Sequence, residues 1–94
     1  MIERTWFTQT PDGREFELVF RVAAPVREPG GEWSAEAGLF PIESGCKIYG
    51  EDGWQAASLA LRFLAARAQD FSERGWKFFW NKGGEEATVD ELMV

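Results

Sequence analysis

Few side chains in this sequence have the chemistry of a catalytic or metal site. Histidine is absent, which removes the usual general base near neutral pH, the commonest metal ligand and any Ser-His or Cys-His nucleophile. Cys46 is the single cysteine, so no internal disulfide can form. Acid-base chemistry without histidine needs carboxylates, lysine or tyrosine gathered in a pocket, and the sequence indicates none. We therefore expect no enzyme activity, no metal and no cofactor.

The best-placed carboxylates are Glu15 and Glu17, which share one face of a predicted strand. Such a pair supports acid-base catalysis only if burial or close approach separates the two pKa values, and the flanking residues indicate neither. The glycine pair in "EPGGEW" lacks the lysine and the strand-to-helix context of a phosphate-binding loop. We interpret that segment as a loop.

The charge balance bears on the class of partner. Sixteen acidic against ten basic side chains give a net charge of −6, which repels nucleic acid and favours basic proteins. Part of this charge lies near the end of the chain, where it could face a basic partner: Glu85, Glu86, Asp90 and Glu91.

Length and composition predict one small folded domain. Ninety-four residues support a single core, and a 45% hydrophobic, 15% aromatic composition is typical of a globular chain. The longest apolar run is much shorter than the roughly 20 residues that span a bilayer, and "MIERT" does not resemble a leader peptide. With a lone cysteine, a reducing compartment is favoured. We expect a cytoplasmic protein that binds no membrane.

Alternating hydrophobic residues and turn signals predict five strands. The clearest pattern places Phe16, Leu18, Phe20 and Val22 on one face, after a "PDG" turn. In the fourth strand, Cys46 and Ile48 are expected to share the core face. Tryptophans 33, 76 and 80 are expected in the core. The predicted strands cover residues 1–10, 14–22, 33–39, 46–50 and 76–80.

A long helix is predicted between Asp52 and Gly75. Asp52 and Gln55 have the spacing of a capping box, and Gly75 can take the left-handed conformation that ends a helix. The fold class is therefore α+β: an antiparallel sheet of about five strands, in the order β-β-β-β-α-β, with the helix on one face. Residues 1–84 form the domain, and residues 85–94 form an acidic tail in which Thr88 and Glu91 can cap a short helix.

The helix is apolar almost all the way round, so one sheet cannot cover it. With Ala57 as the centre, the stripe from Ala60 and Leu61 to Phe71 faces the sheet. Leu59 and Phe63 then point outward, and Arg62 is the charged residue beside them. Covering this pair would bury some 300 Å², worth about 7 kcal/mol as an upper estimate at 25 cal/mol per Å². The tail, a second copy or another protein could cover it.

The helix start resembles that of a small bacterial domain family of unknown function. The pattern G-x-D-x-x-Q-A-x-x-L-A-L runs from Gly50 to Leu61, and the likeness covers about residues 3 to 80. The resemblance implies a bacterial source and a one-domain fold. It implies no activity, because none is established for the family.

Together these features predict a non-enzymatic, small acidic binding protein. A bacterial immunity or antitoxin-like inhibitor of a basic toxin or enzyme would have this size and charge, with an apolar anchor at Leu59 and Phe63. The alternative is a structural homo-oligomer or accessory subunit that assembles through the outer face of the helix.

Overall fold

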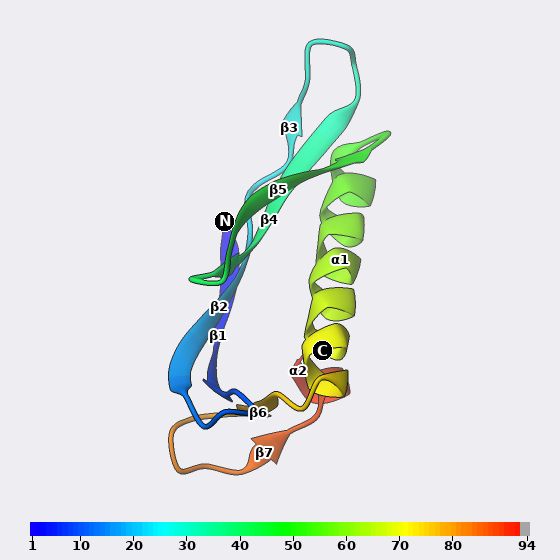
Figure 1. Cartoon of the computed structure of the whole chain (residues 1–94). Helices are drawn as coiled ribbons and strands as arrows, with labels where there is room; N and C mark the ends of the chain where they lie inside the picture. The colour runs from blue at the N-terminus through cyan, green and yellow to red at the C-terminus, as the bar shows by residue number, and fades with distance from the viewer. Residues whose placement is uncertain (93–94) are drawn as a thin grey trace.

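The chain, described over residues 1–92 in a computed structural model, is an open antiparallel sheet with one long helix packed on a single face (Figure 1). This confirms the predicted α+β class. Residues 93 and 94 of the predicted tail lie outside the described residues. Within residues 1–92, no helix combines the length and hydrophobicity needed to cross a bilayer.

Each pair of neighbouring strands in the sheet is antiparallel. Strand β4 pairs with β5 on one edge and with β2 and β3 on the other, and the sheet continues through β1 and β6 to β7. The bounds are β1 Ile2–Gln9, β2 Glu15–Val22, β3 Val26–Arg27, β4 Trp33–Phe40, β5 Glu43–Gly50, β6 Lys77–Phe79 and β7 Glu86–Ala87.

The sequence analysis did not predict the two shortest strands. Strands β3 and β7 span two residues each, too few to show a period-2 pattern. Strand β3 continues the line of β2 beyond the break at residues 23–25, so the β3–β4 hairpin extends past the rest of the sheet (Figure 1). The molecule is accordingly elongated, at 45 × 22 × 21 Å.

Helix α1 spans Gly53–Glu73 and ends as predicted. The Asp52 carboxylate accepts a hydrogen bond from the Gln55 amide at 2.7 Å. In a capping box the Gln55 side chain would accept a hydrogen bond from the Asp52 amide. Here it accepts from the amide of the preceding residue, Glu51, at 2.7 Å. Beyond the helix, Gly75 adopts φ +94°, a conformation that costs glycine little.

Small side chains bring α1 close to the sheet. Ala56, Ala60 and Ala68 are completely buried, and their methyl groups let the helix approach β4 and β5. Leu64 and Phe71 are buried on the same face of the helix. The helix lies over a core whose other buried apolar members are Trp6, Leu18, Phe20, Val22, Ala35, Ala37, Leu39, Phe78 and Ala87.

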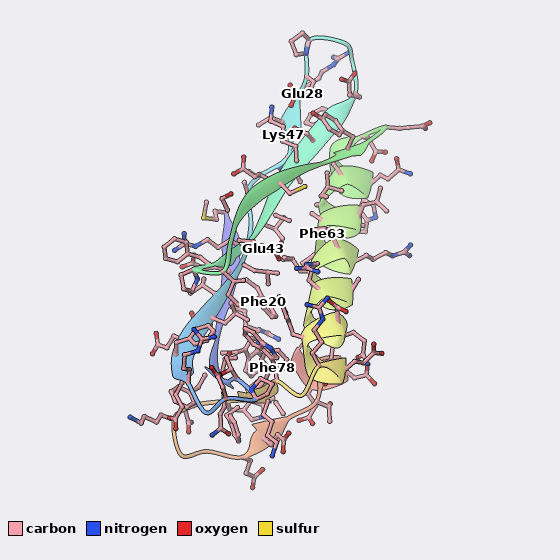
Figure 2. The ribbon with its side chains drawn as sticks, viewed as in Figure 1. Phe20, Glu28, Glu43, Lys47, Phe63 and Phe78 are labelled. Carbon is pink, nitrogen blue, oxygen red and sulfur yellow. The ribbon has the colours of Figure 1, made fainter. Side chains whose placement is uncertain are left out.

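The predicted orientation of the helix was partly wrong. Leu61, expected to face the sheet, is 42% exposed, whereas Phe63, expected to point outward, packs against the core between helix and sheet (Figure 2). Leu59 is half-buried. The buried stripe is centred nearer Ala60 than Ala57, which turns the Phe63 side of the helix toward β5. A helix with apolar residues on every side gives no unique phase, so contact with the sheet sets it.

Two predictions about single core residues were also wrong. Trp80 is 48% exposed and stacks edge-on against Trp6 with ring centroids 4.4 Å apart, and it is Trp6 that lies in the core. Cys46 is exposed on β5 instead of sharing the core with Ile48. Strand β5 is an edge strand, so residues on its helix-facing side can lie beyond the width of the helix.

The segment after β6 folds back onto the domain. Ala87 in β7 is buried, and Val89, at the start of the short helix α2 (Val89–Leu92), packs against the core. The predicted capping box forms: the Glu91 amide donates to Thr88 Oγ1 at 3.2 Å, and the Thr88 amide donates to Glu91 Oε1 at 3.2 Å. Part of the acidic tail is therefore structural.

The close helix-sheet approach predicts a sharp contrast between two alanines. Ala60→Leu should lower the free energy of unfolding by roughly 1–3 kcal/mol, because the larger side chain cannot fit without moving α1 or rotating neighbours off their rotamers. Ala66→Leu, on the exposed side of the same helix, should change it by less than about 0.5 kcal/mol. Urea denaturation measures both, and equal effects would contradict this account of the core.

Candidate functional site

The residues singled out from the sequence fall on two separate surfaces. Leu59, Arg62 and Phe63 lie in the first half of α1, with Arg62 exposed and the other two half-buried. The four acidic tail residues, Glu85, Glu86, Asp90 and Glu91, are exposed at the opposite end of the helix. The structure therefore does not unite the expected apolar anchor with the expected acidic patch.

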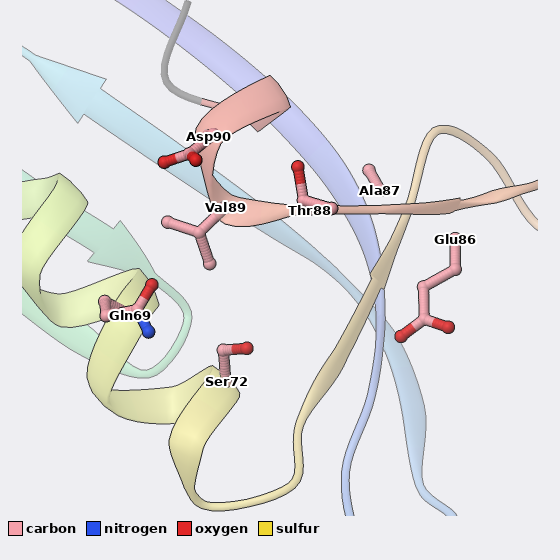
Figure 3. A pocket seen from close by; sticks show the side chains of 7 residues that line it. All are labelled: Gln69, Ser72, Glu86, Ala87, Thr88, Val89 and Asp90. Atoms are coloured by element: carbon pink, nitrogen blue, oxygen red, sulfur yellow. The ribbon is translucent and has the colours of Figure 1, made fainter.

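Two of the tail carboxylates line a pocket of about 390 Å³ (Figure 3). Gln69 and Ser72 form its wall on α1, and Val89 points from the start of α2 into the space between them and the tail. The Glu91 carboxylate accepts a hydrogen bond from the Thr88 hydroxyl, and Glu91 is not among the residues that line the pocket. The lining residues are Gln69, Ser72, Glu86, Ala87, Thr88, Val89 and Asp90.

A larger groove, of about 510 Å³, lies at the other end of the molecule. Its lining residues come from the turn of the β3–β4 hairpin and from the junction between β5 and α1. Its lining residues are Gly30, Gly31, Glu32, Tyr49, Gly50, Glu51 and Gln55. We call this the hairpin groove.

Two glycines shape the hairpin groove. Gly31 adopts φ +96° in the hairpin turn, where its amide donates to the Glu28 carbonyl at 2.9 Å. Gly50 ends β5 so close to the helix that an added Cβ would lie 2.5 Å from the Ala56 amide nitrogen. Any other residue at position 50 would push the strand away from the first turn of α1, so the junction depends on glycine there.

The hairpin groove is acidic and aromatic. Glu32 on the hairpin and Glu51 before the helix are both exposed and, among the described residues, have no ion-pair partner. Tyr49 is 53% exposed, and Trp54, which precedes the lining residue Gln55 in the first turn of α1, is 84% exposed. An indole exposed to this degree is costly in water and is a typical anchor in protein interfaces.

Close to the groove, Glu28 and Lys47 form a paired cluster with Ser34 (Figure 2). The Ser34 hydroxyl donates to Glu28 Oε1 at 2.6 Å, and Lys47 Nζ lies 3.2 Å from the same oxygen. The Ser34 hydrogen bond, followed by Lys47, lowers the pKa of Glu28, and Glu28 raises the pKa of Lys47. Lys47 is therefore paired with Glu28 and, among the described residues, forms no ion pair with Glu32 or Glu51.

These groups can hold a cationic or aromatic side chain but form no metal site. Among residues 1–92, no group of three or more His, Cys, Asp or Glu side chains is placed to bind a metal ion. The carboxylates considered for acid-base work, Glu15 and Glu17, are both exposed on β2. Exposed aromatic rings such as Tyr49 belong to the residue types that are enriched in protein interfaces.

Sequence reasoning did not find the hairpin groove. Its parts were each interpreted as local structure: a loop at residues 28–32, a strand end at Gly50 and a helix start at Asp52. The two walls of the groove, residues 30–32 and 49–55, are about twenty residues apart in the sequence, so no local sequence pattern shows that they meet. One signal was present, because Trp54 immediately follows a predicted helix start, where a large indole has little to pack against.

The Glu28 cluster predicts a specific pH dependence. Because the pKa of Glu28 is lowered on folding, its ionisation stabilises the protein above about pH 4.5, and this contribution disappears as the pH falls through the lowered value. Glu28→Gln keeps an acceptor for Ser34 but loses the charge, so it should be less stable than wild type at pH 7, with the difference shrinking at pH 3. Denaturant titrations at both pH values measure this, with Glu17→Gln as a control that shows no such trend.

Comparisons of the chain with protein-family models, with curated proteins and with solved structures find no match. The resemblance of residues 3 to 80 to a small bacterial family therefore stays a prediction, and the function must be argued from the structure itself.

Proposed function

We propose that this chain is a non-enzymatic binding protein that holds a basic protein partner, in the manner of a bacterial immunity or antitoxin-like inhibitor. A cytoplasmic location is part of the proposal, and the single exposed cysteine is compatible with it. The observation that supports the proposal best is the hairpin groove, which Glu32 and Glu51, without an ion pair among the described residues, line together with exposed Tyr49.

The arrangement of charge supports a basic partner. The groove presents two carboxylates and no lysine or arginine among its lining residues, and Asp52 adds a further exposed carboxylate at the helix start. A surface of one sign attracts an oppositely charged protein over a distance of about 10 Å at 0.1 M salt and accelerates their encounter. The rings of Tyr49 and Trp54 would then supply the short-range apolar contact that long-range charge cannot.

Binding of a basic peptide tests this proposal. We would titrate the isotope-labelled protein with an unstructured peptide of net charge about +5 and follow the backbone amides by NMR. The expected result is a set of shifts confined to residues 30–32 and 49–55, with an affinity that falls as salt is raised. Shifts centred on the tail, or spread evenly over the surface, would count against the groove.

Two double variants that each remove two negative charges show whether the peptide binds at the groove or at the tail. Glu32→Gln/Glu51→Gln should weaken peptide binding about three- to tenfold, because each exposed carboxylate near a cation contributes up to about 1 kcal/mol. Glu85→Gln/Asp90→Gln removes the same two charges at the other end and should leave the affinity within about twofold. The reverse order would move the site to the acidic tail.

A second function, self-association through the outer side of α1, is favoured by a different observation. Trp54 and Leu61 are seven residues apart and therefore project on the same side of the helix, and both are exposed. Leu59 and Phe63, first expected there, are half-buried and contribute less area.

Light scattering decides between a monomer and a helix-paired dimer. The leading proposal predicts a mass of 10.6 kDa at all accessible concentrations. If self-association is the function, the mass doubles with concentration and Leu61→Glu restores the monomer, while Arg62→Ala, also exposed, does not.

A further inference from the structure

We infer that the hairpin groove selects an arginine side chain of its partner, whose guanidinium stacks on Tyr49 while its N–H groups reach Glu32 and Glu51. This inference rests on the proposed function and specifies the chemistry of the partner.

Two arginines in this chain combine the same two contacts. Arg21 lies over the ring of Phe40, 5.2 Å from its centroid, and its Nε donates to Glu3 at 3.0 Å. Arg67 lies 5.0 Å from the Phe71 centroid, and its Nε donates to Glu43 at 3.0 Å. A flat guanidinium satisfies both contacts at once, because its face stacks on a ring while its edge carries the donors.

The hairpin groove has the ring and the carboxylates without the arginine. Tyr49 is half exposed, Glu32 and Glu51 lack an ion pair among residues 1–92, and the lining residues include no cation. The nearby Lys47 is held by Glu28 at 3.2 Å and also interacts electrostatically with Tyr49. An arginine from outside the chain would complete the arrangement that Arg21 and Arg67 each form within it.

The geometry of the walls favours arginine over lysine. Glu32 belongs to the hairpin tip and Glu51 to the β5–α1 junction, so the two carboxylates approach the groove from different elements. Five N–H donors spread over a planar fork can address both carboxylates and still leave a face for Tyr49. An ammonium is a compact, strongly hydrated charge that loses more by giving up water for the same contacts.

The test compares two peptides that differ at one residue. A capped Gly-Ser peptide with a single central arginine and its lysine counterpart would each be titrated by NMR into the whole chain. We expect the arginine peptide to bind about two- to fivefold more tightly, with shifts at residues 49–51 and 30–32.

Variants of Tyr49 show whether its ring causes the preference for arginine over lysine. Tyr49→Leu should abolish the preference for arginine while leaving weak, salt-sensitive binding of both peptides, and Tyr49→Phe should retain it because the ring face remains. Unchanged amide spectra outside the groove would establish that both variants are folded.

The possible outcomes separate this inference from the proposed function. Equal affinities for the two peptides at the groove would overturn the arginine inference and leave the basic-partner proposal standing. If neither single-residue peptide shifts the amide signals of the groove, and the peptide of net charge +5 also fails to bind there, both the arginine inference and the basic-partner proposal are overturned. An arginine preference that survives Tyr49→Leu would also overturn the stacking arrangement.

Discussion

The close approach of α1 to β4 and β5 is the contact on which the rest of the structure depends. Three fully buried alanines, Ala56, Ala60 and Ala68, bring the helix backbone down onto the sheet, and larger side chains fill the margins. The Arg67–Glu43 ion pair then connects the helix to β5 at 3.0 Å. Because a core at crystal-like packing density admits little adjustment, this contact fixes both the rotation of α1 and the position of its first turn.

The groove at the hairpin end follows from that position. Once the first turn of α1 is held against the sheet, β5 must end against it, which only a glycine at position 50 permits. The β3–β4 hairpin extends past the sheet and supplies the second wall. Glu51, Asp52 and Trp54 are thereby presented together at an end of the molecule, where few neighbouring side chains are available to pair with them or cover them.

The acidic character of the chain is divided between structural and free carboxylates. Glu28, Glu43 and Glu91 hold a lysine, an arginine and a helix cap in place, so they contribute to folding. Glu32 and Glu51 have no such role among the described residues, and their charge is available to a partner. A net charge of −6 therefore says less about binding than the location of the carboxylates that the fold leaves unpaired.

The sequence by itself determined the fold class, strands β1, β2 and β4 and both ends of α1, because period-2 alternation, the Asp52 cap and Gly75 are local signals that chain neighbours decide. It placed the start of β5 at Cys46, whereas β5 begins at Glu43 in the segment expected to be a turn. It did not determine the rotation of α1, which placed Phe63 against the core and Leu61 outside, since a helix apolar on every side fits a sheet in several rotations. The hairpin groove likewise depends on segments about twenty residues apart, whereas the two-residue strands β3 and β7 are too short to show an alternating pattern. Only tertiary packing brings such segments together, because side-chain fit across an interface leaves no periodic trace along the chain.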